Sequence, residues 1–127
     1  MDGGELEEIG RLVVETYIKA LNTRDSSLLQ TCLHFPHIRI LKDGDFQDWA
    51  TAKEYLTGFE KRLQSDNWNS TRLLTIKTEK ISSKKAHTSI EFERLRADGS
   101  IIGRYFSLYV ISYENDYWGI RFGSGTG

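Results

Sequence analysis

Residues 71–123 read TRLLTIKTEKISSKKAHTSIEFERLRADGSIIGRYFSLYVISYENDYWGIRFG and decide the fold class. Polar and apolar residues alternate here with a period of two, and β-branched and aromatic residues are frequent, which is typical of β-strands. Short polar turns interrupt the pattern three times, and such short connections favour antiparallel pairing of consecutive strands. We therefore predict a meander of four strands, at residues 71–81, 86–96, 101–113 and 117–123.

The residues before this stretch predict helices. Apolar residues between Leu6 and Leu21 recur every three or four positions, the spacing of a helix with a buried face. Asp25 or Ser26 can cap a short second helix that ends near Cys32. These two helices precede every predicted strand.

A third helix is predicted after a first pair of short strands. Pro36 breaks helix and favours an extended segment at 37–41, followed by a turn and a brief strand at 46–48. Thr51 and Glu54 then have the spacing of a capping box, which marks a helix start. The order predicts an α+β fold in which three N-terminal helices pack on a mostly antiparallel sheet. A chain of 127 residues has the size of one domain, 1–127, whose core we expect at about 6–123.

The charge balance argues against several classes of partner. Lys and Arg number 17 against 18 Asp and Glu, and the formal net charge is -1. A nucleic-acid-binding surface needs an excess of positive charge, so we expect no nucleic-acid partner. No apolar run approaches the roughly 20 residues of a membrane-spanning helix, and the N-terminus is acidic where a signal peptide would be basic. We therefore expect a cytoplasmic location and no membrane partner.

Cysteine and histidine usage predicts no metal and no cofactor. Cys32 is the single cysteine and lies among leucines, which favours a buried structural thiol over a nucleophile. The three histidines have no metal-binding spacing. The glycines near the turns do not form a phosphate-binding motif.

Three stretches carry a resemblance to a known superfamily. They are VVETYIKALNTRDSSLLQ at 13–30, LHFPHIRI at 33–40 and RADGSIIGRYFSLYVISYENDYWGIR at 96–121. Together with the order of elements, they resemble the nuclear-transport-factor-2-like (NTF2-like) superfamily, and its bacterial SnoaL-like members in particular, over about residues 6–123. The resemblance implies a cystatin-like cone, in which the helices pack on a strongly curved sheet around a conical pocket. The superfamily includes isomerases, dehydratases, epoxide hydrolases, transport adaptors and assembly domains, so the fold alone does not imply one function.

Ketosteroid isomerase is the most informative relative that the resemblance offers. Its oxyanion is held by a tyrosine of the first helix and a protonated aspartate, while another carboxylate moves the proton. The resemblance aligns Tyr17 with that tyrosine, but it aligns Leu41 with the base and Ser107 or Leu108 with the second aspartate. Only a slip of two or more residues would bring a carboxylate of 43–45 to the base position. We predict no steroid isomerase activity.

Strand alternation predicts which polar side chains share a face. His37 and Arg39 are two residues apart, so their side chains project to the same face of their strand, and the resemblance implies that this face lines the pocket. By the same alternation, Tyr105 and Ser107 project to the pocket face of the strand at 101–113. Together with Tyr17 of the first helix, they form a candidate ligand site. A neutral histidine there could act as a base, and an arginine could bind an anionic group.

Structural roles are open for the same residues. Tyr17 also fits the buried stripe of its helix, and Arg39 could pair with Glu91 or Glu93 rather than with a ligand. Trp49 and Trp68 flank the third helix near the expected pocket mouth. Both tryptophans are candidates for contact with a flat apolar ligand.

The absence of an aspartate dyad favours binding over catalysis. Our leading hypothesis is a protein that binds a small, hydrophobic, oxygenated molecule. The alternatives are an acid-base enzyme of the dehydratase, isomerase or epoxide hydrolase type, and a dimeric assembly module with a vestigial pocket. Polar groups around a large cavity would favour the enzyme, whereas a cavity filled by the protein's own aromatic side chains would favour assembly.

The strand predicted at 101–113 is apolar on both faces, unlike a strand with one face in water. The three helices can cover one face, and the resemblance assigns them the side of Tyr105. The other face then exposes Phe106, Leu108 and Val110, and a contiguous apolar patch of this kind is typical of an interface. We predict a homodimer that pairs through this sheet face.

Overall fold

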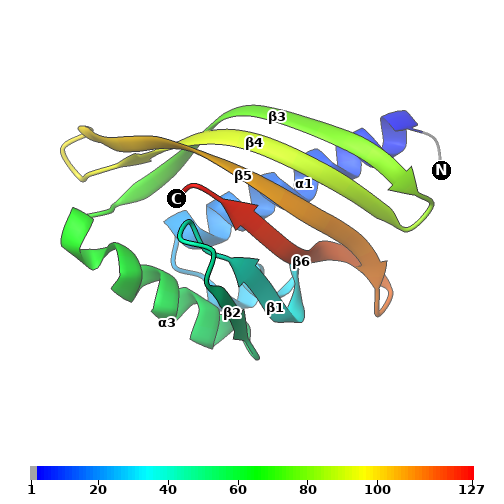
Figure 1. Ribbon diagram of the computed structural model, residues 1–127, viewed down its shortest axis with the longest axis horizontal. Helices are drawn as coiled ribbons and strands as arrows, with labels where there is room; N and C mark the ends of the chain where they lie inside the picture. The colour runs from blue at the N-terminus through cyan, green and yellow to red at the C-terminus, as the bar shows by residue number, and fades with distance from the viewer. Residues whose placement is uncertain (1–2) are drawn as a thin grey trace.

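The computed structural model describes residues 3–127, and this part of the chain folds as helices packed on one sheet (Figure 1). The helices are α1 (Gly3–Asn22), α2 (Ser26–Gln30), α3 (Ala52–Leu63) and the short 3-10 helix η1 (Gln64–Asp66). The strands are β1 (Leu33–Ile40), β2 (Phe46–Trp49), β3 (Ser70–Ser82), β4 (Lys85–Leu95), β5 (Ile101–Glu114) and β6 (Tyr117–Gly125). The predicted α+β class is confirmed.

The helix starts are fixed by the caps that the sequence predicts. Asp25 caps α2, and its Oδ1 accepts the backbone N–H of Leu28 at 3.0 Å. Thr51 caps α3, and its Oγ1 accepts the N–H of Glu54 at 3.2 Å. Each bond satisfies a backbone donor that the first turn of a helix leaves without a partner.

The strands form one sheet in the order β2-β1-β6-β5-β4-β3. Neighbours are antiparallel except β1 and β6, which are parallel, and β3 to β6 pair in chain order, as the predicted meander requires. Register shifts interrupt the pairing of β4 with β5 and of β5 with β6. Such bulges bend strands, and Figure 1 shows β3, β4 and β5 arching over α1.

The first strand is longer than predicted. The sequence predicts it over 37–41, whereas β1 runs from Leu33 and includes Pro36, which follows a cis peptide bond. The pairing with β6 shifts register between Leu33 and Ile38. Proline has no N–H to donate, so it is tolerated in a strand where the ladder is irregular.

The helices and the inner face of the sheet enclose the core. Side chains of β5 alternate as predicted: Ser107 and Tyr109 are buried on the inner face, while Phe106 and Leu108 are exposed on the outer face. The Tyr17 ring of α1 packs edge-on against Tyr109, with 5.7 Å between ring centres. In residues 3–127, no helix has the length and apolar character to cross a bilayer.

Candidate functional site

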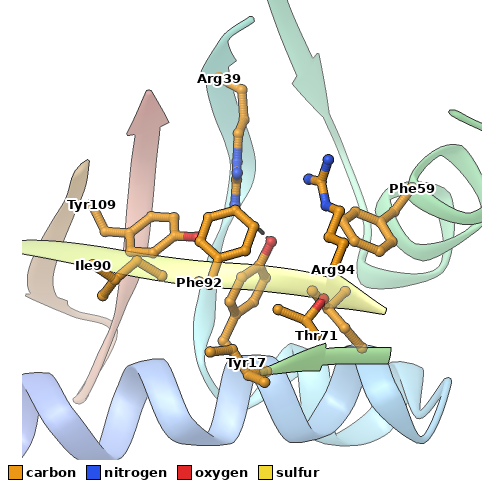
Figure 2. Close-up of a pocket in the computed structure, with 10 residues that line it drawn as sticks. Tyr17, Arg39, Phe59, Thr71, Ile90, Phe92, Arg94 and Tyr109 are labelled. Atoms are coloured by element: carbon orange, nitrogen blue, oxygen red, sulfur yellow. Dashed lines mark hydrogen bonds between the residues drawn. The ribbon is translucent and has the colours of Figure 1, made fainter. Parts of the chain in front are cut away.

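The interior of the cone is almost filled by side chains. Between α1, α3 and the sheet there is a cavity of about 20 Å³, which has room for about one water molecule. Its walls combine aromatic rings with two arginines (Figure 2): Tyr17, Ile18, Leu21, Arg39, Phe59, Thr71, Ile90, Phe92, Arg94 and Tyr109. We call it the inner cavity. The resemblance implies a conical pocket, and this interior is narrower because large aromatic and guanidinium groups occupy it.

Arg39 is the central polar group of this interior. Its Nη2 donates to the hydroxyl of Tyr17 at 2.7 Å, and its Nε donates to Nε2 of His37 at 3.1 Å. The guanidinium lies between 5.2 and 5.5 Å from the ring centres of three tyrosines, Tyr17, Tyr55 and Tyr109. Burial opposes the charge of Arg39, but these tyrosines favour it, and the net effect raises the pKa of the guanidinium.

The pairing of Arg39 with Glu91 or Glu93 that the sequence allowed is wrong. Glu93 instead lies between Arg72 and Arg104, with its Oε2 3.3 Å from Arg72 and its Oε1 3.7 Å from Arg104. Strand alternation explains the difference, because Glu93 faces the opposite side of β4 from the inward-facing residues before and after it. In residues 3–127, no ion pair joins Arg39 to a carboxylate.

His37 is fully buried, and both of its ring nitrogens have partners. Nε2 accepts from Arg39, so Nδ1 carries the proton and donates to the carbonyl oxygen of Ile120 at 3.3 Å. Burial, followed by the positive charge of Arg39, lowers the pKa of His37 to about 2. The imidazole is therefore neutral, and its one lone pair is already used. It is not free to act as a general base.

Tyr17 and Tyr55 extend the network into the helices. Their hydroxyl oxygens are 2.5 Å apart, and the fully buried Tyr55 ring packs edge-on against His37 and Trp49. Burial raises the pKa of Tyr17 well above its ordinary value. Tyr55 was not among the residues that the sequence predicted for the site. Whether its hydroxyl meets that of Tyr17 depends on how α1 and α3 are placed relative to each other, and the sequence carries no local signal for this placement.

A second, larger cavity opens beside the C-terminal end of α3. Its volume is about 250 Å³, and its walls come from the turn after β1, from α3 and η1, and from β4, β5 and the C-terminal segment: Leu41, Lys42, Asp43, Arg62, Leu63, Asp66, Arg94, Tyr105, Thr126 and Gly127. We call it the outer cavity. Arg94 lines both cavities, and its guanidinium carbon lies 4.7 Å from the ring centre of Tyr105. Sequence reasoning missed both Arg94 and Arg62.

Four of the predicted site residues line a cavity or depression. Tyr17 and Arg39 line the inner cavity, and Tyr105 lines the outer one. Trp68 borders a separate open depression beside α3, where its Nε1 donates to Thr71 at 3.1 Å and Arg24 lies over its ring.

The other three predicted site residues lie in the core. His37 sits behind Arg39, and Trp49 packs on Tyr55 with 4.9 Å between ring centres. Ser107 is buried where β5 pairs with Gly125 of β6. None of the three is among the residues that line the inner and outer cavities.

The chemistry of the inner cavity is that of hydrogen-bond donation. Its walls offer tyrosine hydroxyls, a threonine hydroxyl and two guanidinium groups, and they include no carboxylate and no free imidazole. Such a set can bind an oxygen acceptor, but it has no group to take a proton from carbon. Within residues 3–127, no three His, Cys, Asp or Glu side chains group as metal ligands.

The comparison with protein families agrees with this architecture. Residues 7–124 match the family described as "NTF2-like protein (DUF6841)". The chain belongs to this NTF2-like family. No curated protein matches the chain. The resemblance to SnoaL-like members is finer than this match and stays a prediction.

Solved structures share the fold of this NTF2-like protein at low sequence identity. An NTF2-like protein of unknown function from Pseudomonas putida KT2440 is 10% identical with a TM-score of 0.74, over 98% of this chain and 87% of that one. A domain with a cystatin-like fold from Nostoc punctiforme is 16% identical with a TM-score of 0.72, over 99% and 78%. The hexachlorocyclohexane dehydrochlorinase LinA-type3 from Novosphingobium barchaimii LL02 is 8% identical with a TM-score of 0.70, over 93% and 83%. Likeness at this level concerns the fold alone.

Proposed function

We propose that this NTF2-like protein binds a small, hydrophobic, oxygen-bearing molecule in the outer cavity, without turning it over. The observation that carries the proposal is the outer cavity, which has about 250 Å³ of space against about 20 Å³ in the inner cavity. Leu41, Leu63 and Tyr105 give it apolar walls, and Arg94 brings hydrogen-bond donors to its base. Apolar walls with a few polar groups are typical of small-molecule sites.

The same region supports binding rather than acid-base catalysis. His37 uses both ring nitrogens within the core, so it cannot reach a ligand as a base. Asp43 and Asp66 are the acidic side chains that line the outer cavity, and both are exposed to solvent. Enzymes make a carboxylate a good base by removing it from water, which these positions do not do.

The test is whether the purified protein carries a small molecule. The protein is denatured, and the supernatant is searched by mass spectrometry, with wild type compared with Leu41→Trp and Leu12→Trp. The indole introduced by Leu41→Trp would fill the outer cavity, so we expect that variant to lose the molecule. Leu12 is 63% exposed on α1, away from the cavity, so its variant serves as the matched control and should keep it. Retention by Leu41→Trp would place the molecule elsewhere and contradict the proposal.

We also propose that two copies pair through the outer face of β5, which is the assembly role among the alternatives. Phe106 and Leu108 are 54% and 40% exposed there, and Val110 shares their face. The aromatic filling of the inner cavity supports the same role, because a cone packed for rigidity can serve as a scaffold. Binding in the outer cavity and pairing through the sheet use different surfaces, so the two roles are compatible.

A further inference from the structure

Two arginines meet at the outer cavity with unused donors. Arg94 is only 6% exposed, and its buried Nε has no hydrogen-bond partner in residues 3–127; the same holds for the buried Nε of Arg62. Neither guanidinium forms an ion pair with an acid in the described chain. Both side chains line the outer cavity, Arg94 from β4 and Arg62 from α3.

This arrangement is unfavourable for folding alone. A buried donor without an acceptor costs free energy, and a buried charge without a counter-charge costs more. The rings of Phe59, Phe92 and Tyr105 lie under the Arg94 guanidinium at 5.8, 5.4 and 4.7 Å, and they offset part of the cost. Burial and the charge of Arg62 still lower the pKa of Arg94. A methionine would fill the same space without these penalties.

We infer that Arg94 and Arg62 form an anion site, and that the molecule bound in the outer cavity carries a carboxylate. The inference rests on the proposed binding function and names the class of its ligand. A guanidinium presents parallel N–H groups that match the two oxygens of a carboxylate. The carboxylate would supply the counter-charge that both guanidinium groups lack, and its apolar body would lie against Leu41, Leu63 and Tyr105.

The other charges of the cavity favour a carboxylate over a phosphate. Lys42 adds one positive charge to the two arginines, and Asp43 and Asp66 add two negative charges. The side chains of the walls therefore carry a single net positive charge, which suits a monovalent anion better than a divalent one. A phosphate monoester carries close to two negative charges at neutral pH and would be repelled by the two aspartates.

The experiment is calorimetric titration of the full chain with four probes of similar size. Hexanoate and phenylacetate carry a carboxylate, hexanamide is the neutral control, and hexyl phosphate carries the other anion. We expect both carboxylates to bind, and hexanamide to bind at least on the order of tenfold more weakly, because hydrogen bonds to charged groups are the stronger ones. Arg94→Met and Arg62→Met should each weaken hexanoate binding by a similar factor. Arg11→Met, at an exposed position of α1, is the matched control and should leave it unchanged.

Thermal unfolding without probes separates a binding role from a structural one. Arg94→Met removes an unsatisfied buried charge, so its Tm should equal or exceed that of wild type while hexanoate binding is lost. A lower Tm together with unchanged hexanoate binding would assign Arg94 to folding and overturn the inference.

The probes also separate the two proposals. If hexanamide binds as tightly as hexanoate and Leu41→Trp abolishes both, the small-molecule proposal holds and the anion site is wrong. If hexyl phosphate binds more tightly than hexanoate, the choice of a carboxylate is wrong. If none of the probes binds to wild type, the anion site is wrong, and the small-molecule proposal is decided by mass spectrometry of the denatured supernatant.

Discussion

Arg39 donates its Nε–H to Nε2 of His37 across 3.1 Å, so the two most polar side chains on the inner face of β1 bind each other. Two residues apart in a strand, they project to the same face. The bond fixes the tautomer of His37, and the Nη2 of Arg39 donates a second hydrogen bond to the hydroxyl of Tyr17. The sequence allowed His37 to act as a base and Arg39 to bind an anion, but in the structure both side chains form hydrogen bonds within the core.

The neutral state of His37 makes the protein sensitive to acid. The pKa of His37 is lowered to about 2 in the folded chain, against about 6.5 for an ordinary histidine. Below pH 6.5 the unfolded chain therefore binds a proton that the folded chain does not. The free energy of unfolding should fall with decreasing pH by up to about 1.4 kcal/mol per pH unit from this group. Urea denaturation at pH 7.5 and pH 5.5 measures the change.

The variant His37→Gln isolates this contribution. It cannot take up a proton, so its loss of stability between pH 7.5 and 5.5 should be smaller than that of wild type, although its stability at pH 7.5 is lower. An NMR titration that follows the ring chemical shifts of His37 against pH provides an independent check. An imidazole of His37 that titrates near pH 6.5 in the folded protein would contradict the buried, Arg39-bound state.

The hydroxyl of Tyr17 should contribute measurably to stability. Tyr17→Phe leaves the Nη2 of Arg39 and the hydroxyl of Tyr55 without their shared partner in the core. Leaving buried donors unsatisfied costs about 1–3 kcal/mol, so the urea midpoint should fall with an unchanged slope. Tyr113→Phe is the matched control at a 37% exposed position and should change stability by less than about 0.5 kcal/mol. Equal stability of both variants would show that the Tyr17 hydroxyl does not hold the network.

The sequence predicts the fold well because periodicity records which face of each element is buried. The alternation on β5 separates Ser107 from Phe106 correctly, and the caps at Asp25 and Thr51 lie where helices begin. Such signals act over a few residues, so they can be read without knowing the partner element. The start of β1 was missed because Pro36 obscures the strand pattern.

The site is predicted less well because its contacts join distant segments. Parity brings Arg39 to the inner face, but it does not say that a tyrosine of α1 rather than a glutamate of β4 receives its hydrogen bond. In the sequence, Arg94 is one of several charged residues of its strand, and nothing marks it as buried. Its burial results from the packing of α3 and the C-terminal segment against the sheet. The volume of the cavities depends on side-chain packing between helices and sheet, which no local pattern encodes.

Steroid isomerase activity should be absent. The position that the resemblance aligns with the catalytic base is Leu41, and this residue lines the outer cavity as an apolar wall. The inner cavity offers no carboxylate in its place. A spectrophotometric assay with a Δ5-3-ketosteroid should give the rate of buffer alone, and Leu41→Asp tests whether a carboxylate at that position starts turnover. Activity of the wild type above buffer would show that the aligned register is wrong.

The last prediction concerns the outer face of β5. Phe106, Leu108 and Val110 form an apolar stripe on the side of the sheet opposite to α1, and no element of the described chain covers Phe106 or Leu108. Burying such side chains is worth roughly 1.5–3 kcal/mol each. Burial of the stripes of both copies therefore offsets the free-energy cost of fixing two molecules together. We expect a homodimer at micromolar concentration.

Light scattering coupled to size exclusion measures the mass directly. The expected value is twice the 14.6 kDa of one chain. Phe106→Asp should shift the protein toward monomer and leave its circular dichroism unchanged, because the side chain is outside the core. Phe46→Asp makes the same change at a 67% exposed position on β2 and should leave the dimer intact, so it controls for added charge. A wild-type mass near that of one chain would rule out the sheet-face dimer, and dissociation by Phe46→Asp alone would place the interface on β2 instead.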